Sequence, residues 1–275
     1  VINDTYEPGS TFKVVTATAA LDSGRVTLNN HYSCSGRIHV ADRFVRCANA
    51  RGHGAQTFAQ SLQNSCNPAF ITWGLMTGKD NMVKYMESLG LYSKTGVDLP
   101  GEAGSIIHKT ENIKELDLAI MSFGQSFQIA PLQLLRAVSA VVNGGKLVTP
   151  HFGVKKIDTE GNISVLEYEE SGTIIKQSTT ETMRGLLKNV VELGGGLNCR
   201  IEGYSIAGKT ATSEKLPRGN GKYIASFIGI APAENPQVIA MCIIDEPVGM
   251  HYGGVIAAPV VKSLFENILP YLGIE

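Results

Sequence analysis

The chain has 275 residues, and its 24 lysines and arginines against 25 aspartates and glutamates give a formal net charge of −1. Hydrophobic residues make up 43% and charged residues 18%, which is typical of a folded globular protein and excludes a disordered or coiled-coil chain. The balanced charge gives no reason to expect nucleic acid or an anionic membrane surface as a partner. No apolar run approaches the ~20 residues that a membrane-spanning helix needs.

The first predicted element is a helix over residues 10–22, STFKVVTATAALD, which begins after the break at Pro8-Gly9. The helix consists mostly of valine, alanine and other small residues on all of its faces. We therefore expect it to be buried on most sides. Residues 31–53 alternate weakly and contain Cys, Gly and His, which predicts an irregular hairpin that turns around Ala41-Asp42.

The middle of the chain has the pattern of several helices. Thr57 is a predicted N-cap for a helix that reaches about Asn64, and Pro68 fits the first turn of a helix that continues through Leu75. The segment Ser65-Cys66-Asn67 would then lie at the junction of the two helices. Further helices are predicted over residues 80–89, 131–142 and 179–193.

The last third of the chain is rich in β-forming residues. The runs SIAGKTAT (205–212), YIASFIGIA (223–231) and QVIAMCIID (237–245) are joined by short turn segments, which favours an antiparallel meander. A helix over residues 256–269 is predicted to follow. Helices first, then strands, then a helix predict an α+β fold with helices packed on a sheet.

Ser10 and Lys13 form an S-x-x-K pair at the start of the buried helix. Residues i and i+3 share one helix face, so the amine can reach the hydroxyl. A serine hydroxyl is a poor nucleophile until a base takes its proton, and a lysine can be that base when burial lowers its pKa. The alternative is a serine N-cap beside a solvated lysine, and the apolar surroundings of Lys13 weigh against it.

Two further short segments belong with this pair. They are Ser65-Cys66-Asn67, an S-x-N at a helix junction, and Lys209-Thr210-Ala211-Thr212 in a predicted strand. Each segment alone is more often structural, as a cap, a turn or an edge-strand lysine. In this order, however, S-x-x-K, S-x-N and a K-T-G-like strand are the signature of penicillin-binding proteins and serine β-lactamases.

The flanks of these motifs extend the likeness. The segments YEPGSTFK, NSCNPAF, FGQSFQIAPLQLLRAVSAVVNGG, AGKTAT and YGGVIAAPV resemble the transpeptidase domain of class B penicillin-binding proteins, of the division and sporulation type. The resemblance runs from Tyr6 to about Lys262. It implies the transpeptidase fold shared with serine β-lactamases, which has an antiparallel central sheet flanked by helices and an all-helical lobe. It also implies that residues 1–275 are one transpeptidase domain, a fragment without the upstream strands that complete the sheet, the pedestal domain and the membrane anchor.

The resemblance implies a catalytic role for five residues. Ser10 would be the acylated nucleophile and Lys13 the base that takes its proton. Ser65 would relay a proton toward the leaving group, and Asn67 would hold the substrate amide. Lys209 would supply positive charge near Ser65.

The resemblance also implies a set of substrate-binding residues. Thr210 and Thr212 would bind the terminal carboxylate of the substrate, and the backbone N–H groups of Ser10 and Thr212 would form the oxyanion hole. Gln125, in the FGQSF segment, is a further implied substrate-binding position. The family has glycine where this chain has Ala211, and glycine there lets the substrate backbone approach closely. The added methyl group is expected to displace the substrate or rotate the strand, which puts activity and penicillin affinity in doubt.

The implied function is that of a peptidoglycan D,D-transpeptidase, in which a serine acyl-enzyme cross-links stem peptides and β-lactams trap the serine. A β-lactamase or D,D-carboxypeptidase on the same fold is an alternative, and so is a catalytically weak scaffold for wall synthesis. Catalysis needs no cofactor in this interpretation. The implied partners are peptidoglycan stem peptides, β-lactams and membrane-bound wall-synthesis proteins including a glycosyltransferase, and the implied location is the extracytoplasmic face of a bacterial cell membrane.

Cys34, Cys47 and His53 raise a separate question, because a hairpin would bring the two cysteines together. The chain has five cysteines, an odd number that cannot all pair internally. One interpretation is a disulfide, which an extracytoplasmic location permits. The other is a structural zinc site, which needs a fourth ligand: His31, Asp42 or a more distant residue. The predicted hairpin places Asp42 at its tip, which disfavours that residue.

Overall fold

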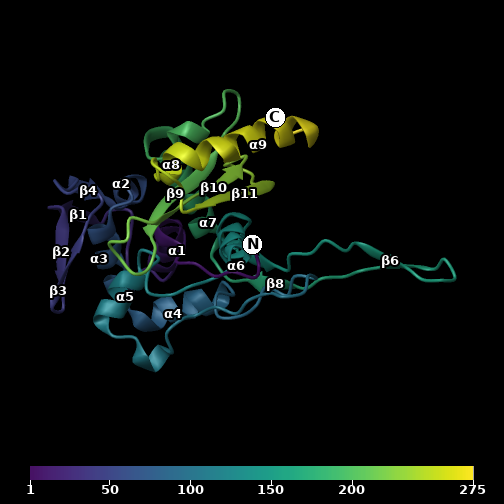
Figure 1. The fold of residues 1–275 in the computed structure, drawn as a ribbon, viewed down its shortest axis with the longest axis horizontal. Coiled ribbons are helices and arrows are strands. Elements are labelled where there is room, and N and C mark those ends of the chain that lie inside the picture. Colours follow the sequence, from purple (N-terminus) through teal and green to yellow (C-terminus); the bar gives the residue numbers. More distant parts are fainter. Residues whose placement is uncertain (275) are drawn as a thin grey trace.

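An antiparallel sheet of three strands lies at the centre of the molecule (Figure 1). The structure is a computed structural model, and it describes residues 1–274. The strand order is β11-β10-β9, and the bounds are β9 Ala207–Glu214, β10 Tyr223–Ala231 and β11 Val238–Asp245. Both pairings are antiparallel, which confirms the predicted meander. Strand β9 lies two residues further along the chain than the run 205–212 predicted.

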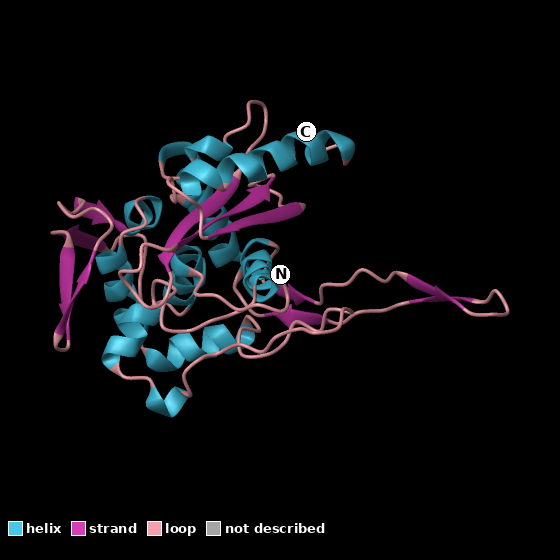
Figure 2. Ribbon diagram, in the orientation of Figure 1, coloured by secondary structure: helices cyan, strands magenta, loops and turns pink. Residues whose placement is uncertain are grey.

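Helices cover both faces of this sheet (Figure 2). Successive side chains of a strand point to opposite faces, so Ile228 and Ile230 of β10 join the larger hydrophobic core, while Phe227 and Ala231 join a smaller one. The larger core includes residues of α1, α6 and α7, and the smaller core includes residues of α9. These helices and the short α8 have the bounds α1 Lys13–Asp22, α6 Pro131–Val142, α7 Gln177–Leu193, α8 Gly253–Ile256 and α9 Ala258–Tyr271.

Helix α1 is buried along almost its whole length, as the sequence predicts. Every residue of the helix except Leu21 is buried. A 3-10 turn, η1 (Gly9–Phe12), precedes it, so the predicted helix over residues 10–22 consists of two parts. The helix is therefore placed by packing on all sides, which fixes the position of Lys13 at its first residue.

A lobe of four helices stands beside the sheet, with bounds α2 Phe58–Gln63, α3 Asn67–Thr77, α4 Lys79–Ser88 and α5 Glu115–Met121. The predicted N-cap of α2 is confirmed, because the backbone N–H of Gln60 donates to Thr57 Oγ1 at 3.2 Å. The backbone N–H of Thr57 donates in turn to Gln60 Oε1 at 2.9 Å, which completes a capping box. Helix α3 begins with Pro68 in its first turn, as predicted.

Two strand pairs replace the single irregular hairpin predicted for residues 31–53. Their bounds are β1 His31–Cys34, β2 Arg37–Val40, β3 Arg43–Arg46 and β4 Gly54–Thr57. Strands β2 and β3 form a tight hairpin with Ala41-Asp42 at its tip, where Ala41 has a φ of 51°. Strand β1 pairs with β4, so the tight hairpin is an insertion between the strands of an outer pair.

An extended arm projects far from the body of the molecule (Figure 1). It is built on the strands β5 Lys146–Val148, β6 Lys155–Ile157, β7 Ile163–Val165 and β8 Glu170–Thr173, paired as β5-β8 and β6-β7. The sequence did not predict these strands, nor α5 or the short 3-10 helices η2 (Thr110–Asn112) and η3 (Leu197–Cys199).

The architecture confirms the predicted α+β class, with helices packed on an antiparallel sheet and a separate helical lobe. Within residues 1–274, no helix combines the length and the apolar character that crossing a bilayer requires.

Candidate active site

Ser10 and Lys13 lie within hydrogen-bond distance at the start of α1. Lys13 Nζ is 3.0 Å from Ser10 Oγ. Gly9 makes this position possible, because it has a φ of +55° and a Cβ there would lie 1.9 Å from Ser213 Oγ. Only a residue without a side chain lets the segment before Ser10 lie so close to β9.

Lys13 is fully buried and also contacts the S-x-N segment. Its Nζ donates to Asn67 Oδ1 at 2.7 Å and to the backbone oxygen of Ser65 at 2.6 Å, and it lies 3.2 Å from Ser65 Oγ. Ser65 has a positive φ of 52° between α2 and α3, which turns its carbonyl and hydroxyl toward the lysine. Burial lowers the pKa of Lys13 to about 7, so a neutral amine is accessible near neutral pH.

Lys209 of β9 approaches Ser65 from the sheet. Its Nζ donates to Ser65 Oγ at 2.9 Å and to the carbonyl oxygen of Thr210 at 3.0 Å. The side chain is buried, and burial together with the charge of Lys13 lowers its pKa well below the usual range. The structure thus joins Ser10, Lys13, Ser65 and Lys209 in one chain of polar contacts from three separate segments.

The substrate-binding residues predicted on β9 divide between its two faces. Thr210 and Thr212 are half-buried on one face of the strand. Lys209 and Ala211, which alternate with them along the strand, are buried on the other face. Thr212 Oγ1 accepts a hydrogen bond of 3.1 Å from the backbone N–H of Gly253, which places the YGG segment next to a residue predicted to bind the substrate carboxylate.

Ala211 differs from the expectation drawn from the sequence. Its side chain is only 3% exposed, and its Cβ is 3.7 Å from the point where a Cβ on Gly9 would lie. The methyl group therefore packs inside the protein and does not stand free in the cleft. An effect on substrate would have to act through the position of β9 against the catalytic segment.

Gln125 lies in the turn that follows α5, next to the segment before Ser10. The backbone N–H of Gly9 donates to the carbonyl oxygen of Gly124 at 2.8 Å. Gly124 has a φ of +86°, and a Cβ there would lie 2.0 Å from Gly9 O, so the two chains meet backbone to backbone. Gln125 itself is half-buried, which leaves part of its side chain open to solvent.

The structure brings the predicted cysteines and histidine together and adds a fourth residue. Cys34, Cys47, His53 and Cys66 each offer one ligand atom, and these atoms all lie within 4.8 Å of one another. Cys47 Sγ is 3.5 Å from His53 Nδ1 and 4.0 Å from Cys66 Sγ. This group can hold a metal ion. Within residues 1–274, the five cysteines are free thiols, without the Cys34–Cys47 disulfide that was the alternative.

The fourth member, Cys66, was not among the ligands that the sequence named. Asp42 lies at the hairpin tip with a side chain 80% exposed, and His31 is exposed on β1, so neither joins the group. The hydrogen bond with Cys66 lowers the pKa of the Cys47 thiol to about 5, and the same contact, with burial, raises that of Cys66. A metal would replace this shared proton by binding both sulfurs as thiolates.

Comparison with known proteins agrees with the fold and the motif geometry. Residues 1–266 match the family described as the penicillin binding protein transpeptidase domain. The chain therefore belongs to this family of serine-motif transpeptidase domains, as the sequence resemblance predicted.

Three relatives illustrate the membership. The chain is 38% identical over 278 residues to "Stage V sporulation protein D" of Bacillus subtilis, covering 98% of this chain and 43% of that protein. It is 32% identical to "Probable peptidoglycan D,D-transpeptidase PenA" of Neisseria flavescens, covering 100% of this chain and 66% of that protein. The solved transpeptidase domain of Burkholderia pseudomallei penicillin-binding protein 3 superposes with a TM-score of 0.86 at 28% identity, covering 98% of this chain and 81% of that one.

Proposed function

We propose that this chain is the acyl-transfer domain of a peptidoglycan D,D-transpeptidase. The observation that carries the proposal is the chain of contacts from Ser10 through Lys13 and Ser65 to Lys209, in which both lysines are buried and both serines are half-buried. It supplies a nucleophile, a base and a proton relay within hydrogen-bond distance of one another, which is the minimum that serine acyl transfer needs. Because the chain spans 43% and 66% of two relatives, the activity of the whole protein is part of the proposal.

Acylation follows from this geometry. Neutral Lys13 takes the proton from Ser10 Oγ, and the oxygen attacks the penultimate D-Ala carbonyl of a stem peptide. The proton then passes through Ser65 to the amine of the terminal D-Ala, which leaves. Lys209 holds the Ser65 hydroxyl in place and contributes positive charge to the relay. The developing oxyanion is stabilised by the backbone N–H groups of Ser10 and Thr212.

Deacylation completes the reaction when an amine from a neighbouring stem attacks the acyl-enzyme. The carboxylate lost with D-Ala is first bound by Thr210 and Thr212, whose hydroxyl groups lie on the half-buried face of β9. A β-lactam presents the same carbonyl and carboxylate, but its leaving group stays tethered after ring opening. The amine therefore does not reach a free site, and Ser10 remains acylated.

Intact mass spectrometry after penicillin exposure tests the function directly. A stable adduct of one penicillin on Ser10 supports the transpeptidase. Rapid release of the adduct would favour the β-lactamase or D,D-carboxypeptidase, and no adduct at all would favour the catalytically weak scaffold.

We also propose the biological setting that the family implies. The substrates are peptidoglycan stem peptides, and the partners are membrane-bound wall-synthesis proteins including a glycosyltransferase. The domain acts on the extracytoplasmic face of a bacterial cell membrane, and a sporulation or division role is supported by the likeness to the stage V sporulation protein. The extent of the domain over residues 1–275 and the upstream strands, pedestal and anchor remain predictions from the resemblance.

We propose that Cys34, Cys47, His53 and Cys66 hold a structural zinc ion. Three thiolates and one imidazole are a common ligand set for four-coordinate zinc, and a Zn–S distance of about 2.3 Å places tetrahedral ligand atoms roughly 3.8 Å apart. The distances of 3.5 Å and 4.0 Å from Cys47 Sγ to His53 Nδ1 and Cys66 Sγ fit that arrangement. Three of the four residues are buried, which is typical of a closed structural site.

The zinc ion would fix the S-x-N segment through its central residue. Cys66 stands between Ser65 and Asn67, and both of these contact Lys13. A metal bound to Cys66 would tie this segment to Cys34 at the end of β1 and to Cys47, which follows β3. Structural zinc contributes folding free energy, so the metal would hold the cleft wall in the position that acylation requires.

A further inference from the structure

Glu7, three residues before Ser10, lies in the segment YEPGSTFK, but nothing so far assigns it a role. Its carboxylate is nevertheless nearly buried, with 10% of the side chain exposed. Oε1 accepts a hydrogen bond of 2.8 Å from the backbone N–H of Ser126, and Oε2 accepts one from the guanidinium of Arg218. A buried carboxylate needs such partners, and hydrogen bonds to a charged acceptor are stronger than neutral ones.

The first partner belongs to the turn that contains Gln125. Ser126 has a φ of +69°, which residues other than glycine rarely adopt, and its hydroxyl contacts His108 Nε2 at 3.0 Å. The bond from its N–H to Glu7 satisfies a backbone donor in this strained turn. Glu7 therefore helps to hold the turn against the segment that leads into Ser10.

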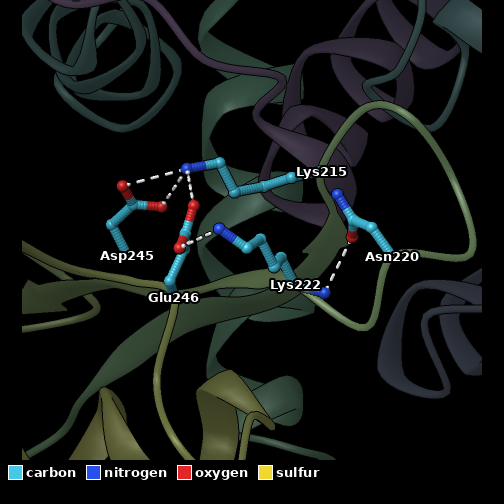
Figure 3. A network of polar contacts seen from close by, with 5 residues as sticks. All are labelled: Lys215, Asn220, Lys222, Asp245 and Glu246. Carbon is cyan, nitrogen blue, oxygen red and sulfur yellow. Dashed lines mark hydrogen bonds and ion pairs between the residues drawn. The ribbon is translucent and has the colours of Figure 1, made fainter.

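The second partner belongs to the loop between β9 and β10, residues 215–222. Ion pairs fix the base of this loop to the end of β11: Lys215 Nζ lies 2.9 Å from Asp245 Oδ1 and 2.8 Å from Glu246 Oε1. Lys222 Nζ lies 2.8 Å from Glu246 Oε2, and Figure 3 shows the loop rising away from this network. Arg218, near the middle of the loop, makes the contact to the catalytic segment.

The direction of the bound peptide brings this loop into the reaction. In the proposed function the terminal carboxylate binds at Thr210 and Thr212, and Gly9, next to Ser10, lies against Ser213. Strand β9 is at the edge of the three-stranded sheet, and Glu214 shares the half-buried face of Thr210 and Thr212. A donor stem peptide bound along this edge would continue toward Glu214 and the loop. Such a peptide would pass between the Gln125 turn and the β9–β10 loop, the two segments that Glu7 joins.

We propose that Glu7 is a positioning residue that sets the spacing of these two segments and so the fit of the donor stem peptide. The inference rests on the proposed acyl-transfer function. None of the hydrogen bonds of Glu7 goes to Ser10, Lys13, Ser65 or Lys209. It acts on substrate binding and leaves the chemical step to those four residues.

The test compares a long and a short acylating substrate. In Glu7→Gln, the amide oxygen still accepts from the Ser126 N–H but the charge that holds Arg218 is lost. We expect the noncovalent dissociation constant for a stem-peptide thioester to rise about fivefold to twentyfold, since a hydrogen bond between charged groups is lost where Arg218 is partly exposed. The first-order acylation constant should stay within about threefold, and both constants for benzylpenicillin, which lacks the long stem, should change less than about threefold.

A double-mutant cycle shows whether the two residues act together. Arg218→Met should weaken thioester binding as much as Glu7→Gln, and the double variant should be no worse than either, because they remove one interaction. Arg218→Lys should restore part of the binding. Lys262→Met, which removes a lysine paired with Glu266 at 3.8 Å on the surface of α9, is the matched control and should change neither constant.

Three outcomes would overturn the inference. These are additive losses in the double variant, no change in thioester binding in either single variant, or equal losses of the acylation constant for both substrates together with a lower melting temperature. If the unaltered protein is not acylated by penicillin, the proposed function fails instead, and that result is separate from all three.

Discussion

Ser10 Oγ and Lys13 Nζ lie 3.0 Å apart at the start of a helix that is buried almost throughout. The serine is therefore placed beside its proposed base by the same packing that stabilises the core. Ser10→Ala should abolish covalent penicillin labelling and leave the melting temperature nearly unchanged, because only a hydroxyl oxygen is lost. Lys13→Ala should slow acylation by at least ~10²–10⁴-fold, the usual contribution of a general base.

Intact mass and a stopped-flow acylation assay measure these effects. Ser23→Ala, which alters the serine at the other end of α1, is a control that should keep wild-type labelling. Undiminished labelling of Ser10→Ala would mean that another residue is the nucleophile.

The acylation rate should rise with pH and level off above about pH 8. Lys13 can accept a proton only when neutral, and burial lowers its pKa to about 7, so below pH 7 the rate should fall about tenfold per pH unit. A rate that is flat from pH 5.5 to 8.5 would contradict Lys13 as the base.

The same pKa shift has a consequence for stability. Unfolded Lys13 has its ordinary pKa near 10.5 and binds one more proton than the folded state between about pH 7 and 10.5. The free energy of unfolding should therefore rise with pH across this window by the contribution of this group. The isosteric Lys13→Met, which cannot titrate, should lose that part of the slope in denaturant titrations.

Ala211→Gly should have little effect on acylation. The Ala211 methyl is buried beside Gly9 and does not line the cleft, so its removal should cost about 1–2 kcal/mol of stability through lost packing and a more flexible strand. We expect the acylation constant to change less than about threefold. A large increase would show that the methyl group displaces the substrate, as the sequence alone suggested.

Purified protein should contain about one equivalent of zinc. Removal of the metal by a chelator should lower both the melting temperature and the acylation rate, since a misplacement of ~1 Å in the cleft can cost ~10²-fold. Cys34→Ser should reproduce both effects without chelator, because Cys34 belongs to the cluster but not to the S-x-N segment.

Cys242→Ser is the matched control, since Cys242 lies on β11 outside the cluster. This variant should keep both the bound metal and the stability of the unaltered protein. A metal-free protein whose mass is two units below the fully reduced value would show that the cysteines form a disulfide and do not bind zinc. That result would leave the assignments of Ser10 and Lys13 untouched.

Local signals in the sequence were sufficient for much of the fold. The helix from Pro131 to Val142 was predicted to the residue, and Thr57 was identified as a cap, because proline, capping residues and helical periodicity all lie within the element. The strands of the arm were missed because they are three or four residues long and mostly exposed, so burial imposes no pattern on them.

The candidate site was predictable where it consists of motifs and unpredictable where it depends on packing. Ser10, Lys13 and Ser65 carry a recognisable order, and the structure brings them together. Cys66 was missed as a cluster member because its thiol reaches the hairpins only through the turn between α2 and α3. Glu7 lies in the segment YEPGSTFK, but its contacts could not be predicted, because its partners lie 119 and 211 residues further along the chain.

The burial of α1 joins catalytic competence to global folding. Nearly every residue of α1 is buried in the main core, and core elements open with nearly the full free energy of unfolding. Disorder confined to the projecting arm would leave Ser10 and Lys13 beside each other, whereas opening of α1 would separate them. The amide protons of α1 should therefore be among the slowest to exchange, and penicillin labelling should disappear in the same transition as the native core.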